Sequence, residues 1–323
     1  MRRFYPFLLL LCVCAGIMPA QAEAAAKKLS FIPLWSPQAQ FAGYYVALEK
    51  GFYRDKGLEV EILTGGPETP ADVLLAKGRA DVGMLWLSEA IKKRAQGVRL
   101  VNIAQILQRS ALMLVAKKSS GIRKVEDLDG KTVALWESFR LQPLALFKKY
   151  KLRVNIIPQT QSVNLFLRDG AAAASVMVYN EYHTIINAGL NPSELTTFFF
   201  YDYGLNFPED GLYMLEKNFN KDPAAAAAFV KATLKGWTYA FEHKDEAVEI
   251  TLRRMRDARI PANRMHQKWM LEKMQGLIFP KGPAAHPGQL KSADYDRVAA
   301  ELLKAGGWES AGYSSFYKDC VTR

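Results

Sequence analysis

Three of the six tryptophans stand directly after stretches that resemble β-strands. They are Trp35, Trp86 and Trp136. An indole ring can stack on a flat heterocycle and contribute about 0.5–1.5 kcal/mol beyond its burial. The ordinary alternative is that each ring seals the core at the end of its strand. Three such rings in three different units favour a ligand-binding cleft, because such sites combine aromatic walls with a few polar groups.

Polar side chains that could orient a ligand follow the same strand ends. They are Gln38, Ser88, Glu137, Asn180, Glu181 and Asp202. Glu181 is the most informative, because a carboxylate accepts paired hydrogen bonds from an amidine-like edge such as that of an aminopyrimidine. Charge-assisted bonds of this kind are roughly twice as strong as neutral ones. The alternative is that Glu181 is an ordinary acidic residue at a helix N-terminus, where the helix dipole favours it.

The sequence contains no motif typical of catalysis or of a metal centre. No HExxH or CxxC spacing joins the four histidines, which are His183, His243, His266 and His286. A GxSxG elbow, a P-loop and a GxGxxG turn are also absent from the sequence. His183 stands close to Glu181, and it either adjusts the cleft or lies on a helix surface. These observations predict a binding protein without catalytic residues, metal or cofactor.

The composition is that of a folded protein with an excess of basic residues. Of 323 residues, 50% are hydrophobic and 23% are charged, and the formal net charge is +11. Such a composition excludes a disordered chain and a disulfide-rich miniprotein. The basic residues are scattered, with short clusters only at 92–94 and 253–254. This pattern predicts a solvated surface and no nucleic-acid partner.

The first 22 residues have the pattern of a cleavable secretory signal peptide. Arg2 and Arg3 precede an apolar run over 7–18, and a small-x-small site ends at Ala22. The apolar run is shorter than the roughly 20 residues that a membrane-spanning helix needs. We therefore expect cleavage after Ala22, location in the periplasm and no stable membrane insertion. The alternative is an uncleaved anchor.

The rest of the chain alternates strand-like and helix-like segments, which is typical of parallel sheets covered by helices. Strands are expected at 28–34, 58–63, 80–85, 99–107, 132–135, 154–157, 174–178 and 195–201. From Pro223 onward the pattern is almost entirely helical.

Two isolated strand-like segments, at 112–116 and 211–215, separate the two groups of β/α units. They predict an α/β protein of two Rossmann-like lobes, with a hinge of two crossing strands and a C-terminal helical tail. Lobe one is expected to comprise 27–113 and 206–323, and lobe two 114–205. A hinge between lobes leaves a cleft that can enclose a small ligand. We expect a monomer.

Five segments of the chain carry a resemblance to a known family. They read QFAGYYVALEKGFYRDKGLEVEI (40–62), ADVGM (80–84), VEDLDGKTVALW (125–136), VYNEYHTIINAG (178–189) and DYGLNFPEDGLY (202–213). Together they resemble periplasmic substrate-binding proteins of the thiamine-pyrimidine ("no message in thiamine") type, over about residues 28–260. The resemblance implies the type II periplasmic-binding-protein fold. It also implies a soluble receptor that serves an ABC permease and its ATPase.

The resemblance also implies a ligand and the residues that hold it. In the pyrimidine-binding members, an aromatic residue after the first strand stacks on the ring, and a carboxylate of the second lobe pairs with its amino edge. These roles map onto Trp35 and Glu181, with Tyr44 and Asn180 as neighbours. The implied ligand is an aminopyrimidine precursor of thiamine.

Other members of the fold bind other ligands, and one is an enzyme. The pyrimidine branch usually has an Asn-rich turn after the first tryptophan, whereas this chain has Gln38 and Gln40. Receptors for a sulfonate, nitrate or a flavin are therefore alternatives. The enzyme, a hydroxymethylpyrimidine phosphate synthase, needs a Schiff-base lysine, a sacrificial histidine and a cysteine-rich loop. Cys320 is the only cysteine after the predicted signal peptide, so we expect a receptor and not this enzyme.

Overall fold

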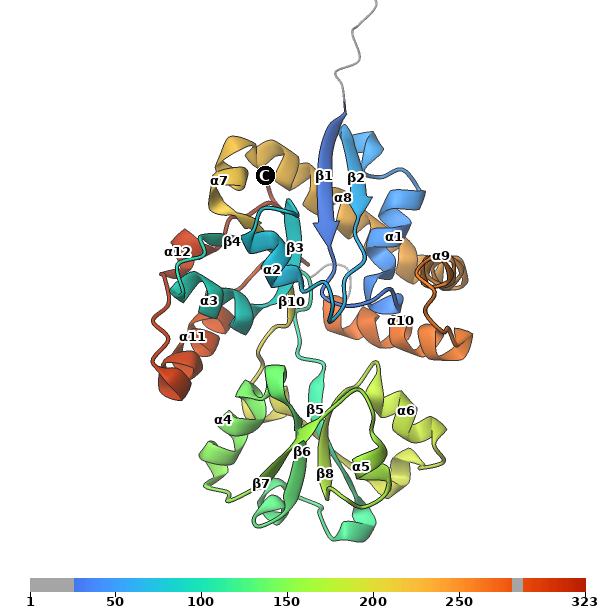
Figure 1. Ribbon diagram of the computed structural model, residues 1–323, viewed down its shortest axis with the longest axis vertical. Coiled ribbons are helices and arrows are strands. Elements are labelled where there is room, and N and C mark those ends of the chain that lie inside the picture. The colour runs from blue at the N-terminus through green and yellow to red at the C-terminus, as the bar shows by residue number, and fades with distance from the viewer. Residues whose placement is uncertain (1–25, 281–286) are drawn as a thin grey trace, which may run out of the picture.

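Two five-stranded sheets form the framework of the protein in the computed structural model, which describes residues 26–280 and 287–323 (Figure 1). One sheet lies above the other in Figure 1, and the chain crosses between them twice. The predicted signal peptide at 1–22 lies outside the described residues. The predicted α/β class with two β/α parts is confirmed.

The first sheet takes strands from distant parts of the chain. Its strands are β1 (Lys27–Ile32), β2 (Leu58–Ile62), β3 (Val82–Trp86), β4 (Leu100–Gln105) and β10 (Asp210–Leu215), in the order β2-β1-β3-β10-β4. β1 is parallel to β2 and β3, whereas β10 is antiparallel to β3 and β4. The register places Asp210 opposite Trp86. Helices α1 (Ala42–Glu49), α2 (Ala71–Ala76) and α3 (Leu87–Ala95) connect the parallel strands.

The second sheet is built from one continuous part of the chain. Its strands are β5 (Leu112–Lys117), β6 (Thr132–Trp136), β7 (Asn155–Gln159), β8 (Ala173–Met177) and β9 (Leu195–Phe199), in the order β7-β6-β8-β5-β9. β6 is parallel to β7 and β8, and β5 is antiparallel to β8 and β9. Its helices are α4 (Leu141–Tyr150), α5 (Asn164–Leu167) and α6 (Glu181–Asn187).

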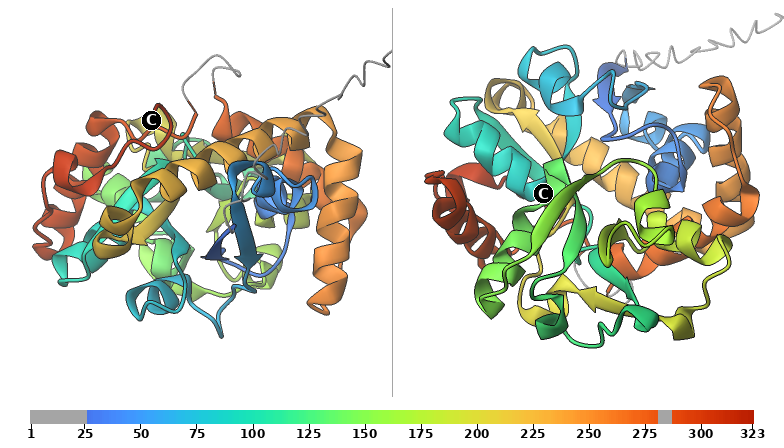
Figure 2. Two further views of the ribbon diagram at one scale, coloured as in Figure 1. Left: turned by 90° about the horizontal axis from the view of Figure 1, so that it is seen from above. Right: turned by 60° about the horizontal axis from the view of Figure 1, so that its bottom comes forward.

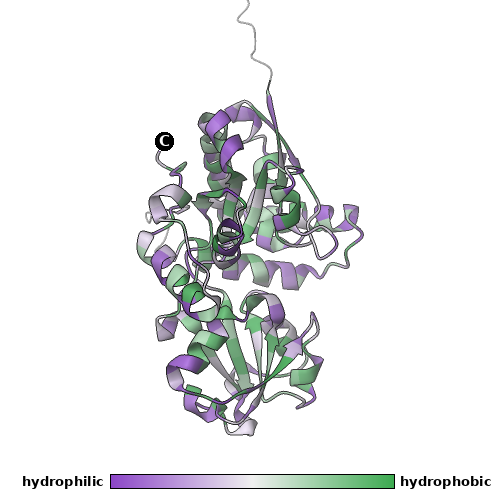
Figure 3. Ribbon diagram, turned by 60° about the vertical axis from the view of Figure 1, so that its left-hand side comes forward, coloured by the Kyte–Doolittle hydropathy of each residue, from purple (hydrophilic) through white to green (hydrophobic). Residues whose placement is uncertain are grey.

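Several strands are continuous runs of buried residues, as expected where helices cover both faces of a sheet. Every residue of β3, β4, β8 and β10 is buried. Figure 3 shows hydrophobic colour along the strands and hydrophilic colour on many of the outer helix turns. Short 3-10 turns link these elements: η1 (Ala39–Phe41), η2 (Arg54–Lys56), η3 (Lys118–Ser120), η4 (Val125–Leu128), η5 (Glu137–Phe139), η6 (Pro192–Glu194) and η7 (Phe200–Tyr203).

The C-terminal part is helical, as predicted, and it surrounds the first sheet (Figure 2). Its helices are α7 (Glu216–Lys221), α8 (Pro223–Glu242), α9 (Lys244–Asp257), α10 (Arg264–Ile278), α11 (Ser292–Gly306) and α12 (Tyr313–Phe316). Asp222 caps α8 by accepting a hydrogen bond from Ala225 N at 2.9 Å. Asn263 caps α10 in the same way, with His266 N at 3.0 Å. This cap explains why α10 begins at Arg264.

The two crossings lie just before β5 and β10, and a buried carboxylate joins them. Glu209 Oε1 accepts hydrogen bonds from Ser110 Oγ at 2.7 Å and from Leu112 N at 3.0 Å. Burial raises the pKa of Glu209 to about 8, although these bonds and that from Ala111 act in the opposite direction. Glu209 therefore ties the two crossings to each other.

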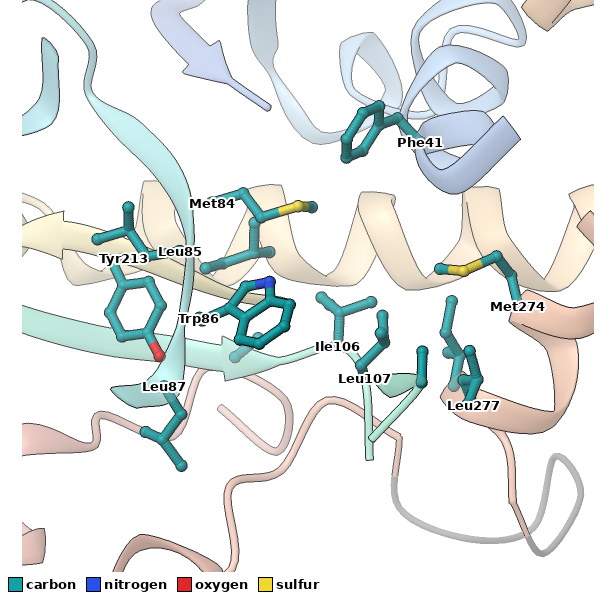
Figure 4. Packing of buried hydrophobic residues seen from close by; sticks show 14 of the residues in the cluster. Phe41, Met84, Leu85, Trp86, Leu87, Ile106, Leu107, Tyr213, Met274 and Leu277 are labelled. Carbon is teal, nitrogen blue, oxygen red and sulfur yellow. The ribbon is translucent and has the colours of Figure 1, made fainter. Parts of the chain in front are cut away.

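Apolar packing continues from the first sheet to α10 at the crossings. Figure 4 shows Ile106 and Leu107 between Trp86 at the end of β3 and Leu277 of α10. All four residues are buried in one cluster. Among the residues that the structure describes, no helix is long and apolar enough to span a bilayer.

Candidate ligand-binding site

A cavity of about 230 Å³ lies between the two sheets, at the carboxyl ends of their parallel strands. Its lining consists of Leu34, Trp35, Gln38, Gln40, Trp86, Trp136, Phe139, Gln161, Met177, Tyr179, Asn180 and Glu181. β1 and β3 position the residues of one side. β6, β7 and β8 position the other. Both halves of the molecule therefore contribute to one site.

Six of the ten predicted ligand-binding residues lie in this lining: Trp35, Gln38, Trp86, Trp136, Asn180 and Glu181. The three tryptophans meet there because each stands at or just beyond the carboxyl end of a parallel strand. Phe139 of η5 adds a further ring and stacks on Trp86 with 3.9 Å between centroids. The indole nitrogen of Trp136 is buried without a hydrogen-bond partner among the described residues. It is a donor available to a ligand.

The other four predicted residues, Tyr44, Ser88, Glu137 and Asp202, lie outside this lining. Tyr44 faces the core on α1, fully buried and stacked on Phe31 at 4.6 Å. Ser88 is buried in the first turn of α3 and is absent from the lining. The two acids point to solvent: Glu137 pairs with Arg140 at 2.8 Å, and Asp202 is exposed in η7.

Glu181 is the one charged side chain in the described lining, which contains no Lys, Arg or His. Only 7% of the residue is exposed. Its Oε2 accepts a hydrogen bond from Met177 N at 2.8 Å, and its Oε1 accepts one from Asn180 Nδ2 at 3.2 Å. Burial raises the pKa of Glu181, and these bonds oppose the shift by stabilising the carboxylate.

A chain of hydrogen bonds orients the amides on the opposite side. Gln40 Nε2 donates to Asp210 Oδ2 at 2.7 Å, and Gln38 Nε2 donates to Gln40 Oε1 at 2.6 Å. Burial raises the pKa of Asp210 to about 6, and the bond from Gln40 lowers it. An ionised carboxylate only accepts hydrogen bonds, so Asp210 orients the amide of Gln40 with its Nε2 towards the carboxylate. Gln40 Oε1 in turn orients Gln38, whose own Oε1 remains an acceptor in the lining.

Sequence reasoning missed several lining residues. Phe139 lies three residues beyond Trp136, in the same segment after β6, and its aromatic side chain is the signal for its place in the lining. Gln161 follows β7, whose carboxyl end was not considered. Gln40 acts through Asp210, which is 170 positions away, and no local pattern predicts that contact.

Comparison with known proteins supports this architecture. The chain is 25% identical over 279 residues to a formylaminopyrimidine-binding protein of Halalkalibacterium halodurans, covering 82% of each chain. It is 27% identical over 130 residues to a 4-amino-5-hydroxymethyl-2-methylpyrimidine phosphate synthase of Saccharomyces cerevisiae, covering 39% of this chain and 38% of the synthase.

The fold is also similar to that of a solved periplasmic sulfonate-binding protein from Methylobacillus flagellatus. The TM-score is 0.69 at 13% identity, and the match covers 92% of this chain and 93% of that one. The model of the family described as "NMT1/THI5 like" matches residues 38–247. The chain therefore belongs to the NMT1/THI5-like family.

Proposed function

We propose that this protein is a periplasmic receptor that binds an aminopyrimidine precursor of thiamine in the cavity and delivers it to an ABC permease and its ATPase. The single observation that carries the proposal is the chemistry of the lining: aromatic rings, one carboxylate and no basic side chain among the described residues. The similarity to a formylaminopyrimidine-binding protein supports the same ligand class.

The hydrogen-bonding groups match an aminopyrimidine. Its exocyclic amino group donates, and Glu181 and Gln38 Oε1 supply acceptors. Its ring nitrogens accept, and Trp136 Nε1 is a buried donor without a partner in the described structure. Trp35 provides a flat surface for the ring, and Phe139, stacked on Trp86, adds an aromatic wall. Each polar edge of the heterocycle therefore finds a complementary group.

The alternative ligands fit less well. Nitrate and sulfonates are anions, and a buried carboxylate repels them where a basic residue would be needed. A flavin carries three fused rings and a sugar chain, whereas a cavity of about 230 Å³ is below the usual range for drug-sized ligands. A small single-ring ligand is the best match.

The synthase alternative finds little support in the lining. That reaction needs a lysine for a Schiff base and a histidine as reactant, and neither residue type lines the described cavity. An absorbance band from a lysine Schiff base with added pyridoxal phosphate would favour the enzyme.

We infer that the receptor is divided into two lobes, 27–113 with 206–323 and 114–205, which close around the ligand by moving at the two crossings. Export to the periplasm rests on the signal-peptide pattern that ends at Ala22. Closure shifts a population of states and involves no covalent step. The closed monomer is the form that the permease recognises.

A thermal-shift screen tests the ligand class. We expect 4-amino-5-hydroxymethyl-2-methylpyrimidine to raise the melting temperature by mass action. Nitrate, an alkanesulfonate and riboflavin serve as the comparison set. Stabilisation by one of these three, with none from the aminopyrimidine, would contradict the proposal.

A further inference from the structure

Helix α10 contacts both sides of the cleft. Towards the first sheet, Gln267 Oε1 accepts a hydrogen bond from Ala39 N at 2.8 Å, at the start of η1. Towards the second sheet, Trp269 Nε1 donates to Val178 O at 3.1 Å. Figure 1 shows α10 on the edge of the upper part that faces the lower part. α10 therefore bridges the two parts next to the cavity.

Two histidines meet across the same gap. Nδ1 of His183 on α6 lies 2.8 Å from Nδ1 of His266 on α10, and the ring centroids are 5.1 Å apart at 22°. His183 also stacks on Trp269 with 4.7 Å between centroids and 10° between planes. Two ring nitrogens at this distance form a hydrogen bond only when one of them carries a proton and the other does not.

The neighbours of the pair determine which nitrogen carries each proton. Asn180 Nδ2 donates to Glu181, so Asn180 Oδ1 is the atom that faces His266 Nε2, at 2.9 Å. Since this oxygen only accepts, His266 Nε2 is protonated, and Nδ1 of the neutral ring is an acceptor. His183 must then donate from Nδ1. When both rings are doubly protonated, the N–H groups at the two Nδ1 atoms face each other and the hydrogen bond between the rings is lost.

Asn180 connects the histidine pair to the cavity. It accepts from His266 and donates to Glu181, and both Asn180 and Glu181 line the site. When His266 is in place, the side chain of Asn180 is held at both ends. The position of the cavity carboxylate is therefore coupled to the contact between α6 and α10.

One of the groups around His183 carries a positive charge. Lys273 Nζ of α10 lies 4.2 Å from the centroid of the Trp269 ring, on which His183 stacks. The neutral side-chain amide of Asn187, from the same helix as His183, lies 3.4 Å from Nδ1 of that ring. Tyr182 of α6 packs at 6.4 Å from Trp269 and is neutral at ordinary pH. Lys273 is therefore the charged group that faces the pair from α10.

The pKa values of the two rings shift in the direction that the contacts predict. Burial, then the charge of Lys273, lowers the pKa of His183. Burial, then the neighbouring His183, lowers the pKa of His266. Because both pKa values lie below the ordinary 6.5, the contribution of the pair to stability is complete above that pH and is lost as the pH falls through the lowered values.

We propose that His183 and His266 form a proton-sensitive latch, which holds α10 against α6 when at most one ring is protonated and releases the cleft when both are. His266 is also a positioning residue for Asn180 and Glu181. This inference rests on the proposed receptor function for its effect on ligand binding. The latch itself is a property of the ligand-free protein, so it can be tested separately.

The first measurement is small-angle X-ray scattering of the ligand-free protein at about pH 7.5 and about pH 5, on either side of the ordinary histidine pKa. We expect the wild-type radius of gyration to increase at the lower pH. His266→Gln and His183→Gln should lose this pH dependence. His243→Gln, which removes an exposed histidine elsewhere, should retain it. A wild-type radius that does not change, or a His266→Gln protein that still expands, would overturn the latch.

The second measurement needs no variant of the pair. NMR titration of the wild-type imidazoles should show two rings that titrate as a coupled pair, with both pKa values below that of an ordinary histidine. Two independent titrations near 6.5 would contradict the proposal.

If these tests succeed, ligand binding should depend on pH through the same pair. When the pH is lowered from about 7.5 to about 5, the dissociation constant for 4-amino-5-hydroxymethyl-2-methylpyrimidine should rise about tenfold more in wild type than in His266→Gln. Scattering that responds to pH, without binding of this pyrimidine, would retain the latch and reject the proposed ligand.

Discussion

Trp86 and Phe139 stack across the cavity with their ring centroids 3.9 Å apart and their planes at 22°, although they come from different sheets. Trp86 ends β3, whereas Phe139 ends the turn after β6. Phe139 also lies 6.4 Å from Trp136. It therefore joins the indoles of both sides and contributes its own ring to the cavity wall.

Phe139→Ala should weaken binding of a small aminopyrimidine by roughly 0.5–1.5 kcal/mol, because one aromatic partner is lost. The enlarged space should at the same time admit bulkier rings, since Phe139 also lines a neighbouring hollow with Trp35 and Gly66. Calorimetric titration of both ligand sizes measures the effect. Leu144→Ala, on the exposed side of α4, is the matched control and should change neither affinity. Unaltered binding by the Phe139 variant would remove this ring from the site.

Glu209 predicts a specific dependence of stability on pH. Its pKa is raised from 4.5 to about 8, so the folded state holds a proton that the unfolded state has already released. The contribution to stability is complete below 4.5 and is lost as the pH rises through about 8, with a slope of at most about 1.4 kcal/mol per pH unit. Glu209→Gln should flatten this part of the curve, as measured by urea denaturation. Glu59→Gln, at an exposed site, is the control and should retain the wild-type slope of the free energy of unfolding against pH. If Glu209→Gln also retains that slope, the Glu209 carboxyl is not its cause.

Two glycines in helices should respond to alanine in opposite directions. A Cβ added at Gly236 of α8 would lie 2.2 Å from Gly43 O of α1, so Gly236→Ala forces the helices apart. We expect it to lower the free energy of unfolding by about 1–3 kcal/mol. At Gly276 of α10 the added Cβ meets nothing within 4 Å, and alanine should stabilise by roughly 0.5–1 kcal/mol. Equal effects of the two variants in denaturant titrations would show that the α1–α8 contact is not tight.

Local periodicity predicted most of the architecture because burial on both faces gives each strand a continuous apolar run. The same logic brought Trp35, Trp86 and Trp136 to one cavity, since the carboxyl ends of parallel strands share an edge. For Tyr44, the family resemblance and the hydrophobic spacing give different predictions: the resemblance places it beside the ligand, and the spacing places it in the core. Its helical spacing with Phe41 indicates a buried face, and the structure places it in the core, not in the lining.

Contacts between distant residues could not be predicted in the same way. Gln40 with Asp210 and His183 with His266 depend on how the C-terminal part returns to the first sheet. The residues next to each partner in the sequence do not indicate which distant residue it will contact. A buried polar side chain finds its partner through the fold, so the partner is known only once the topology is known.

The carboxylate of Glu181 is central to the proposed recognition, and its replacement is the most direct test. Calorimetric titration with 4-amino-5-hydroxymethyl-2-methylpyrimidine should show that Glu181→Gln weakens binding by roughly 1.5–3 kcal/mol, the scale of a hydrogen bond to a charged group. Glu137→Gln, a neighbouring acid that points to solvent, should bind like wild type. An affinity in the Glu181 variant that equals wild type would contradict the account.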